Sequence, residues 1–283
     1  SAVCLVLVVG LTKILSKEQK FSFWEKKDAL TNKYLVKVRN AEIKLFQDQR
    51  KEVLSKLDSF KAFKLDPNII YNAVKLNKDK EIKKTLTLIL PSLTDLFKES
   101  ADETFKLLEV DMSMDVAREE IKKQLIANGK RFANATISFT NDKIKHEIAT
   151  CLAEGKSVEE IKQNLKKFFI ESESYRATRI AQTEVVRYNV GATEQAFIDS
   201  EIVDKKEWFV NPDACEFCLQ MEGKTVDLGE AYHDKGDTIR NEEGDEMTLD
   251  YDTVLGPPLH VNCFIDGQIP VYTSRGLKEI QTI

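Results

Sequence analysis

From Lys17 to Phe60 the chain contains neither glycine nor proline, and this feature constrains its fold more than any other. Apolar residues recur there among many charged ones in a pattern that fits one face of a helix. The segment therefore predicts one long helix or a pair of helices. The apolar positions that set the pattern are Leu35, Val38, Ile43, Leu45, Phe46, Val53, Leu54 and Leu57.

Capping residues and helix breakers divide the next 140 or so residues into further predicted helices. Asp66 precedes Pro67 and is expected to cap a helix there, because proline suits the first helical turn. Ser157 and Glu160 have capping-box spacing. We expect Pro91, Gly129 and Gly155 to end helices. The predicted helices cover residues 68–90, 92–110, about 111–128, 140–154, 157–169 and 174–200.

The pattern changes after Ser200. Residues 205–210 and 223–228 are typical of short strands. The glycine- and acid-rich segment that follows, residues 234–249, is typical of hairpins and loops. With 283 residues, 42% of them hydrophobic, the chain can bury a substantial core. The sequence predicts a mainly α protein in which a helical arm, residues 1–170, is followed by a small α+β module, residues 171–263.

Charge is distributed unevenly along the chain. Residues 201–262 contain 16 Asp and Glu against five Lys and Arg, so residues 1–200 are mildly basic although the net charge is −5. This asymmetry is typical of two units with different surfaces. Both can be ordinary solvated surfaces, or the basic part can lie near nucleic acid or an acidic partner.

Cysteine usage and the first residues limit the compartment. The five cysteines are an odd number and no secretory signal precedes them, which favours a reducing environment over a disulfide framework. The apolar run from Ala2 to Leu11 is shorter than the ~20 residues that a membrane-spanning helix needs. We therefore expect no membrane partner. We interpret this run as the cut end of a longer segment, and the alternative is a buried strand or the start of a helix.

Two pairs of potential metal ligands lie in the small module. Cys215 and Cys218 have C-x-x-C spacing, and His260 and Cys263 have H-x-x-C spacing. Two such pairs on tight turns are typical of a structural zinc site, in which four ligands leave no position open for catalysis. The alternative is that these cysteines are reduced and buried without a metal. A thioredoxin-like site is disfavoured because no βαβ pattern surrounds Cys215, and His146 and His233 have no partners at metal spacing.

Several stretches resemble one family when they are read in order. The segment RATRIAQTEVVRYNVGATEQAF, residues 176–197, is similar to a helix of phage head-morphogenesis proteins, the minor head proteins of the Mu protein F-like kind. A strand with Trp208, the C-x-x-C pair followed by Gly223, and the ending P-P-x-H-x-N-C at residues 257–263 follow in the same order. The resemblance covers about residues 174–263 and rests on Arg176, Ala177, Ile180, Ala181, Thr183, Glu184, Asn189 and Gly191 in its helix.

The resemblance implies a structural role rather than an enzymatic one. Such proteins act in procapsid and head assembly near the portal, and assist DNA packaging or ejection. It implies portal, capsid and scaffold proteins as partners, packaged DNA as a further one, and a place inside the virion, with the host cytoplasm during assembly. Within the helix, Arg179 and Glu184 are expected to act as structural partners. A metal-stabilised binding module unrelated to phages is the alternative from another class.

The chain departs from this family after Cys263. Residues 263–283 resemble the first block of an intein or Hedgehog-type self-processing domain, through Cys263, Asp266, Gly267, Val271, Thr273, Gly276 and Ile280. In that interpretation Cys263 is the catalytic nucleophile that attacks the carbonyl of Asn262, and splicing needs a longer chain. The alternatives are a precursor that carries a C-terminal toxin after a self-processing domain, and a simple strand-forming tail.

Overall fold

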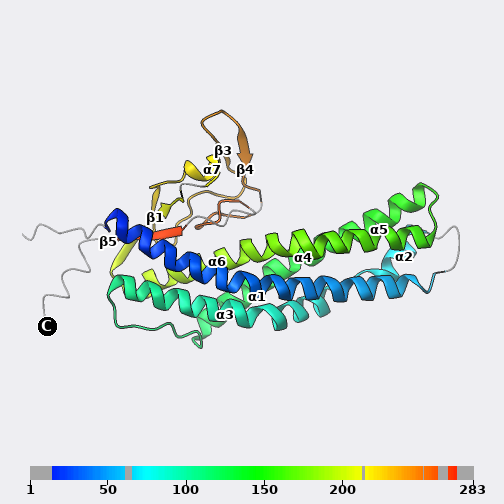
Figure 1. The fold of residues 1–283 in the computed structure, drawn as a ribbon, viewed down its shortest axis with the longest axis horizontal. Helices are drawn as coiled ribbons and strands as arrows, with labels where there is room; N and C mark the ends of the chain where they lie inside the picture. The colour runs from blue at the N-terminus through cyan, green and yellow to red at the C-terminus, as the bar shows by residue number, and fades with distance from the viewer. Residues whose placement is uncertain (1–14, 61–65, 212–213, 251, 261–266, 273–283) are drawn as a thin grey trace, which may run out of the picture. The chain divides into compact units, whose positions relative to one another are not determined.

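The structure is a computed structural model that describes residues 15–60, 66–211, 214–250, 252–260 and 267–272 (Figure 1). It is mainly α with a small α+β part, as the sequence predicts. The helices are α1 (Lys17–Leu57), α2 (Pro67–Val74), α3 (Lys78–Leu108), α4 (Glu119–Ala153), α5 (Val158–Glu171), the π-helical segment η1 (Ser172–Arg176), α6 (Ala177–Ser200) and the short α7 (Glu216–Leu219).

The chain divides into two compact units, each made of segments that are distant in sequence. We call residues 33–95 and 115–185 the central unit, and residues 1–32, 96–114 and 186–283 the terminal unit. Helices α1, α3 and α6 each contribute to both units. No helix in the described ranges is long and apolar enough to cross a membrane.

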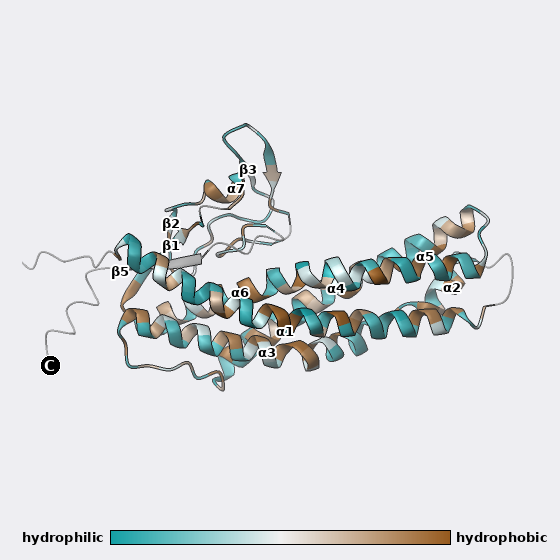
Figure 2. Ribbon diagram, in the orientation of Figure 1, coloured by the Kyte–Doolittle hydropathy of each residue, from teal (hydrophilic) through white to brown (hydrophobic). Residues whose placement is uncertain are grey.

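The central unit has an apolar core to which α1, α2, α4 and α5 contribute. Hydrophobic and hydrophilic residues are interspersed along the long helices (Figure 2). Asp66 caps α2 through a hydrogen bond from the Asn68 backbone N–H, and Ser157 caps α5 in a capping box with Glu160. Both caps confirm the sequence prediction. The core consists of Val53, Leu57, Ile70, Val74, Leu76, Ile144, Ile148, Cys151, Ile161, Leu165 and Phe169.

The terminal unit carries all the described strands. Strand β1 (Val203–Phe209) lies between β2 (Thr225–Asp227) and β5 (Gly267–Tyr272), and both neighbours are antiparallel to it. Strands β3 (Thr238–Arg240) and β4 (Glu246–Thr248) form a separate antiparallel hairpin. The register of β5 places Gly267 opposite Phe209 and Tyr272 opposite Val203, so this segment continues the sheet that β1 begins.

Two of the predicted helix ends are absent. Pro91 lies inside α3, which continues to Leu108, and Gly129 lies inside α4, which continues to Ala153. Proline removes one helical hydrogen bond, and glycine costs about 1 kcal/mol relative to alanine. The neighbouring side chains Ile89, Leu93 and Phe132 are almost fully buried. Their packing outweighs these local penalties, so the sequence prediction was wrong at both positions.

The predicted break between residues 169 and 174 is also absent. Helices α5 and α6 are joined without interruption by η1, where the backbone adopts the wider π-helical turn. A π-helical turn inserts one extra residue into a helix, and such turns occur frequently at functional sites. Here the turn begins the segment that carries the family-like motif, with Arg176 as its last residue.

Candidate metal centre

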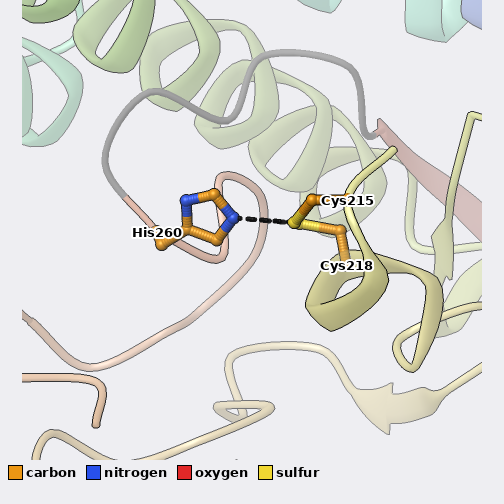
Figure 3. Close-up of side chains that lie close together, drawn as sticks. All are labelled: Cys215, Cys218 and His260. Atoms are coloured by element: carbon orange, nitrogen blue, oxygen red, sulfur yellow. Dashed lines mark hydrogen bonds between the residues drawn. The ribbon is translucent and has the colours of Figure 1, made fainter. Parts of the chain in front are cut away.

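Three of the four predicted metal ligands lie together in the terminal unit (Figure 3). The Nε2 atom of His260 lies 3.1 Å from Sγ of Cys215 and 3.5 Å from Sγ of Cys218. The three ligand atoms all lie within 4.8 Å of one another. Cys263, the predicted fourth ligand, lies outside the described residues.

The two cysteines are positioned by the short helix α7. Cys215 is its N-cap residue in an extended conformation, and the Leu219 backbone N–H donates to the Cys215 carbonyl at 2.9 Å. The Met221 N–H likewise donates to the Cys218 carbonyl. This tight turn brings both sulfurs to one side, with Cys218 buried and Cys215 exposed. The cluster therefore has one ligand in the core and one at the surface.

A small apolar core holds Cys218 and the residue before His260 in place. It contains Trp208, Val210, Cys218, Met221, Leu249, Val254 and Leu259, all buried. The Trp208 ring contacts the Tyr232 ring edge to face, with 5.0 Å between centroids. Leu259 is fully buried in this core, so its packing fixes the position of the backbone next to His260.

Polar contacts fix the surrounding loops. The Asn241 side-chain amide donates to Glu216 at 2.8 Å, which ties the β3–β4 hairpin to α7. The Val210 backbone N–H donates to Glu222 at 2.6 Å. These contacts hold the segments on either side of the cysteine turn, so the ligand positions are built by the surrounding fold as well as by local sequence.

A buried ion pair connects this module to α6. Lys206, whose side chain is 0% exposed, lies 2.6 Å from Glu194 and also donates to the Leu255 carbonyl. The same Glu194 oxygen accepts from the Gly229 N–H. Tyr232 donates its hydroxyl proton to the Lys206 carbonyl. This pair could not be predicted from the sequence, since Lys206 is one of several charged residues in a strand.

The arrangement suits a soft divalent metal. In a tetrahedral zinc site with Zn–S near 2.3 Å and Zn–N near 2.0 Å, a sulfur and a nitrogen lie roughly 3.5 Å apart. The two S···N distances of 3.1 and 3.5 Å are close to that value. Among the described residues no other Cys, His, Asp and Glu group has ligand geometry. His233 instead bridges to Val254 and approaches Asp237.

Asn189, a residue of the family-like motif, lies in a buried polar network of the terminal unit. Its side-chain amide donates to the Lys27 carbonyl at 3.0 Å and to the Thr31 hydroxyl at 2.8 Å. The Ser100 hydroxyl donates to the Asn189 side-chain oxygen at 2.6 Å. Lys27, whose pKa burial holds well below its usual range, donates to Ser100 and Thr104. The motif asparagine therefore joins α1, α3 and α6.

Arg176 and Glu184, which flank the first part of the motif, lie in the central unit. Glu184 is 5% exposed, and Glu42 of α1 is 1% exposed. Desolvation raises the pKa of Glu42 to about 8, with attraction by Arg176 lowering it and repulsion by Glu184 raising it further. Glu42 was not identified from the sequence, because it is one of many charged residues in a long helix. The motif thus marks buried polar groups in both units.

These features define a predominantly helical protein with a small Cys/His module that could hold a metal ion. Residues 142–264 match the model of the family described as Phage Mu protein F like protein. The match includes Arg176, Asn189 and the C-x-x-C and H-x-x-C pairs, and it supports the resemblance to phage head-morphogenesis proteins. No curated protein and no solved structure matches the chain.

Proposed function

We propose that this protein is a structural component of a phage head that acts in head assembly. The observation that carries the proposal is the family match over residues 142–264, which ends on the metal-ligand motif. The cluster of Cys215, Cys218 and His260 supports it further, because a structural centre would stabilise such a module. The match suggests the virion as the location and other virion components as partners.

Within that role we propose a structural zinc ion with Cys215, Cys218, His260 and Cys263 as ligands. Thiolates and an imidazole are the ligands that zinc prefers. When bound, the ion would cross-link the α7 turn to the segment around His260. A site closed by four protein ligands has no open position for substrate or water, so the proposed role is not enzymatic.

We further propose where in the virion this protein lies and which components it contacts. We place the protein inside the capsid near the portal, with portal and capsid or scaffold proteins as contacts and packaged DNA as a further one. The uneven charge supports separate surfaces, since residues 201–262 are strongly acidic and residues 1–200 mildly basic. Assembly would take place in the host cytoplasm.

The test is recovery of the protein in assembled particles. Particles purified from an induced culture of the bacterium that carries the gene are analysed by quantitative mass spectrometry. The proposal predicts that this chain co-purifies with capsid and portal proteins at a few copies per particle. Its absence from particles that contain those proteins would contradict the proposal.

Cys263 has a second predicted role, because its intein-like sequence context predicts a catalytic nucleophile rather than a metal ligand. Strand β5 begins four residues later and pairs along β1, which favours assigning residues 267–272 to the module's own sheet. The self-processing precursor with a C-terminal toxin stays the alternative function. Expression of the gene with its full downstream coding sequence tests it. Cleavage or ligation that Cys263→Ala abolishes would support self-processing, and an intact product would reject it.

A further inference from the structure

A cavity of about 520 Å³ opens in the central unit beside the π-helical segment η1. Its walls combine three cationic side chains, Lys143, Lys167 and Arg176, with three aromatic ones, Phe139, Phe168 and Tyr175. All of these residues belong to α4, α5 and η1. The cavity lies in the unit that does not contain the cysteine cluster, and the proposed head function does not use it.

Arg176 is the most constrained group in this cavity. Its guanidinium lies 4.5 Å from the ring centroid of Phe139, 5.0 Å from that of Phe46 and 5.8 Å from that of Phe168. Its hydrogen bonds go to two neutral hydroxyls at long distances, 3.3 Å to Thr140 and 3.4 Å to Ser172. A guanidinium has five N–H donors, so stacking holds this one in place while leaving donors for a ligand.

The neighbouring charges do not fully offset Arg176. Burial lowers the pKa of Arg176 to about 10, Glu42 attracts the guanidinium and Arg179 repels it. Burial of Glu42 favours the neutral form of its carboxyl, which weakens its attraction for the guanidinium. Glu147 and Glu171 also line the cavity, so the three cationic side chains leave its lining with a formal charge of +1. An anionic ligand would therefore gain most from the Arg176 guanidinium.

Two aromatic rings at this cavity are unusually exposed for apolar groups. Phe139 is 46% exposed and Tyr175 is 62% exposed. The Arg179 guanidinium lies 5.3 Å from the Tyr175 ring centroid, and the Lys143 ammonium lies 5.7 Å from that of Phe139. Exposed rings next to cations are the elements with which proteins stack the bases of single-stranded nucleic acid and hold its phosphates.

We propose that this cavity binds a nucleotide, with its phosphate on Arg176 and the two lysines and its base against Phe139 or Tyr175. The nucleotide can be a free mononucleotide or one unit of a single strand. A free mononucleotide and one unit of a strand both offer a phosphate and a base to the cavity. Lys143 on α4 and Lys167 on α5 are both exposed, so a bound strand can continue past the bound nucleotide into solvent.

The test measures binding by the full chain to three probes. These are inorganic phosphate, deoxyadenosine monophosphate and a fluorescent 12-nucleotide deoxyadenosine strand. The test variant carries Lys143→Gln and Lys167→Gln. The matched control carries Lys145→Gln and Lys166→Gln, which removes two lysines from the same two helices outside the cavity lining. A third variant, Tyr175→Ala, removes an exposed ring, and thermal melting verifies that each variant folds.

The proposal predicts that the monophosphate binds more tightly than inorganic phosphate. The cavity double variant should weaken binding about tenfold or more, because charge-assisted contacts are lost. The control double variant should keep it. Tighter binding of the strand than of the monophosphate identifies nucleic acid as the source, and the reverse identifies a free nucleotide. Equal weakening by both double variants, equal affinity for phosphate and nucleotide, or no binding to any probe would overturn the proposal.

Discussion

The Nε2 atom of His260 lies 3.1 Å from the Sγ atom of Cys215, although the two residues are 45 positions apart in the chain. The segment between them contains strand β2, the β3–β4 hairpin and most of the residues that form the apolar core around Trp208. A bond through a shared metal would close this long loop. Because the ligands are not assembled in an unfolded chain, metal binding would then add directly to the folding free energy of the module.

Removal of a bound metal should destabilise the module more than the rest of the chain. A strong zinc chelator is expected to lower the melting temperature and to expose Trp208, which is fully buried beside Cys218. Tryptophan fluorescence during a chelator titration measures this change. Since Trp24 also contributes to the signal, the titration is repeated with Trp24→Phe. An unchanged spectrum at full chelation would argue against a stabilising metal.

The buried pair of Lys206 and Glu194 should matter far more than the exposed pair of Lys205 and Asp227. Both pairs have an N···O distance of 2.6 Å, but Lys206 is 0% exposed and Lys205 is 48% exposed. Removing one partner of a buried pair costs about 3–5 kcal/mol, while exposed pairs contribute about 0–1 kcal/mol. Chemical denaturation of Lys206→Ala and Lys205→Ala compares them. Equal losses of unfolding free energy would contradict the burial argument.

Asn189→Ala should lower the free energy of unfolding by about 3 kcal/mol. The substitution removes three buried hydrogen bonds of the Asn189 side chain, to the Lys27 carbonyl, the Thr31 hydroxyl and the Ser100 hydroxyl, and a buried hydrogen bond contributes about 1 kcal/mol. Asn32→Ala is the matched control, because its amide donates to Asp28 at an exposed position. The control should change stability by less than about 0.5 kcal/mol. Urea denaturation measures both.

Stability should fall as pH rises from about 4.5 to about 8, through the contribution of Glu42. The pKa of this carboxyl is near 4.5 when unfolded and about 8 in the fold, because burial disfavours its charged form. The folded state therefore binds a proton that the unfolded state releases in this window, at a cost of about 1.4 kcal/mol per pH unit. The contribution is constant below the lower value and above the upper one.

Glu42→Gln isolates this contribution, since glutamine keeps the shape of the side chain without the titration. Unfolding free energies of the parent and the variant are compared at pH 5, 7 and 9. The parent should lose stability relative to the variant as pH rises. A constant difference across the series would mean that Glu42 is charged in the fold throughout.

Local signals predicted the caps, and distant packing decided the rest. Ser157 with Glu160 and Asp66 with Pro67 were predictable because a cap depends on residues two or three positions away. The predicted helix ends at Pro91 and Gly129 were wrong, because the burial of neighbouring side chains decides whether a helix continues. The partners of Lys206 and Asn189 come from other elements of the fold, so no spacing rule could find them.

The proximity of Cys215, Cys218 and His260 was predictable because residue pairs at x-x spacing carry their own turn geometry, whereas their role as metal ligands stays a prediction. The structure brings Cys215, Cys218 and His260 together, while Cys263 stays a prediction. The cavity at Arg176 had no such signal. Its residues come from three helical segments, and each is an ordinary charged or aromatic residue in the sequence.

The most direct test of the metal-stabilised module is native mass spectrometry of the full chain, with metal content measured in parallel. The parent should carry one zinc ion per chain, Cys218→Ser and His260→Asn should lose it, and Cys263→Ser should lose or weaken it if that residue is the fourth ligand. Cys151→Ser, which alters a buried cysteine of the central unit, should retain the ion. A folded parent without metal after purification in zinc-supplemented medium would contradict the account.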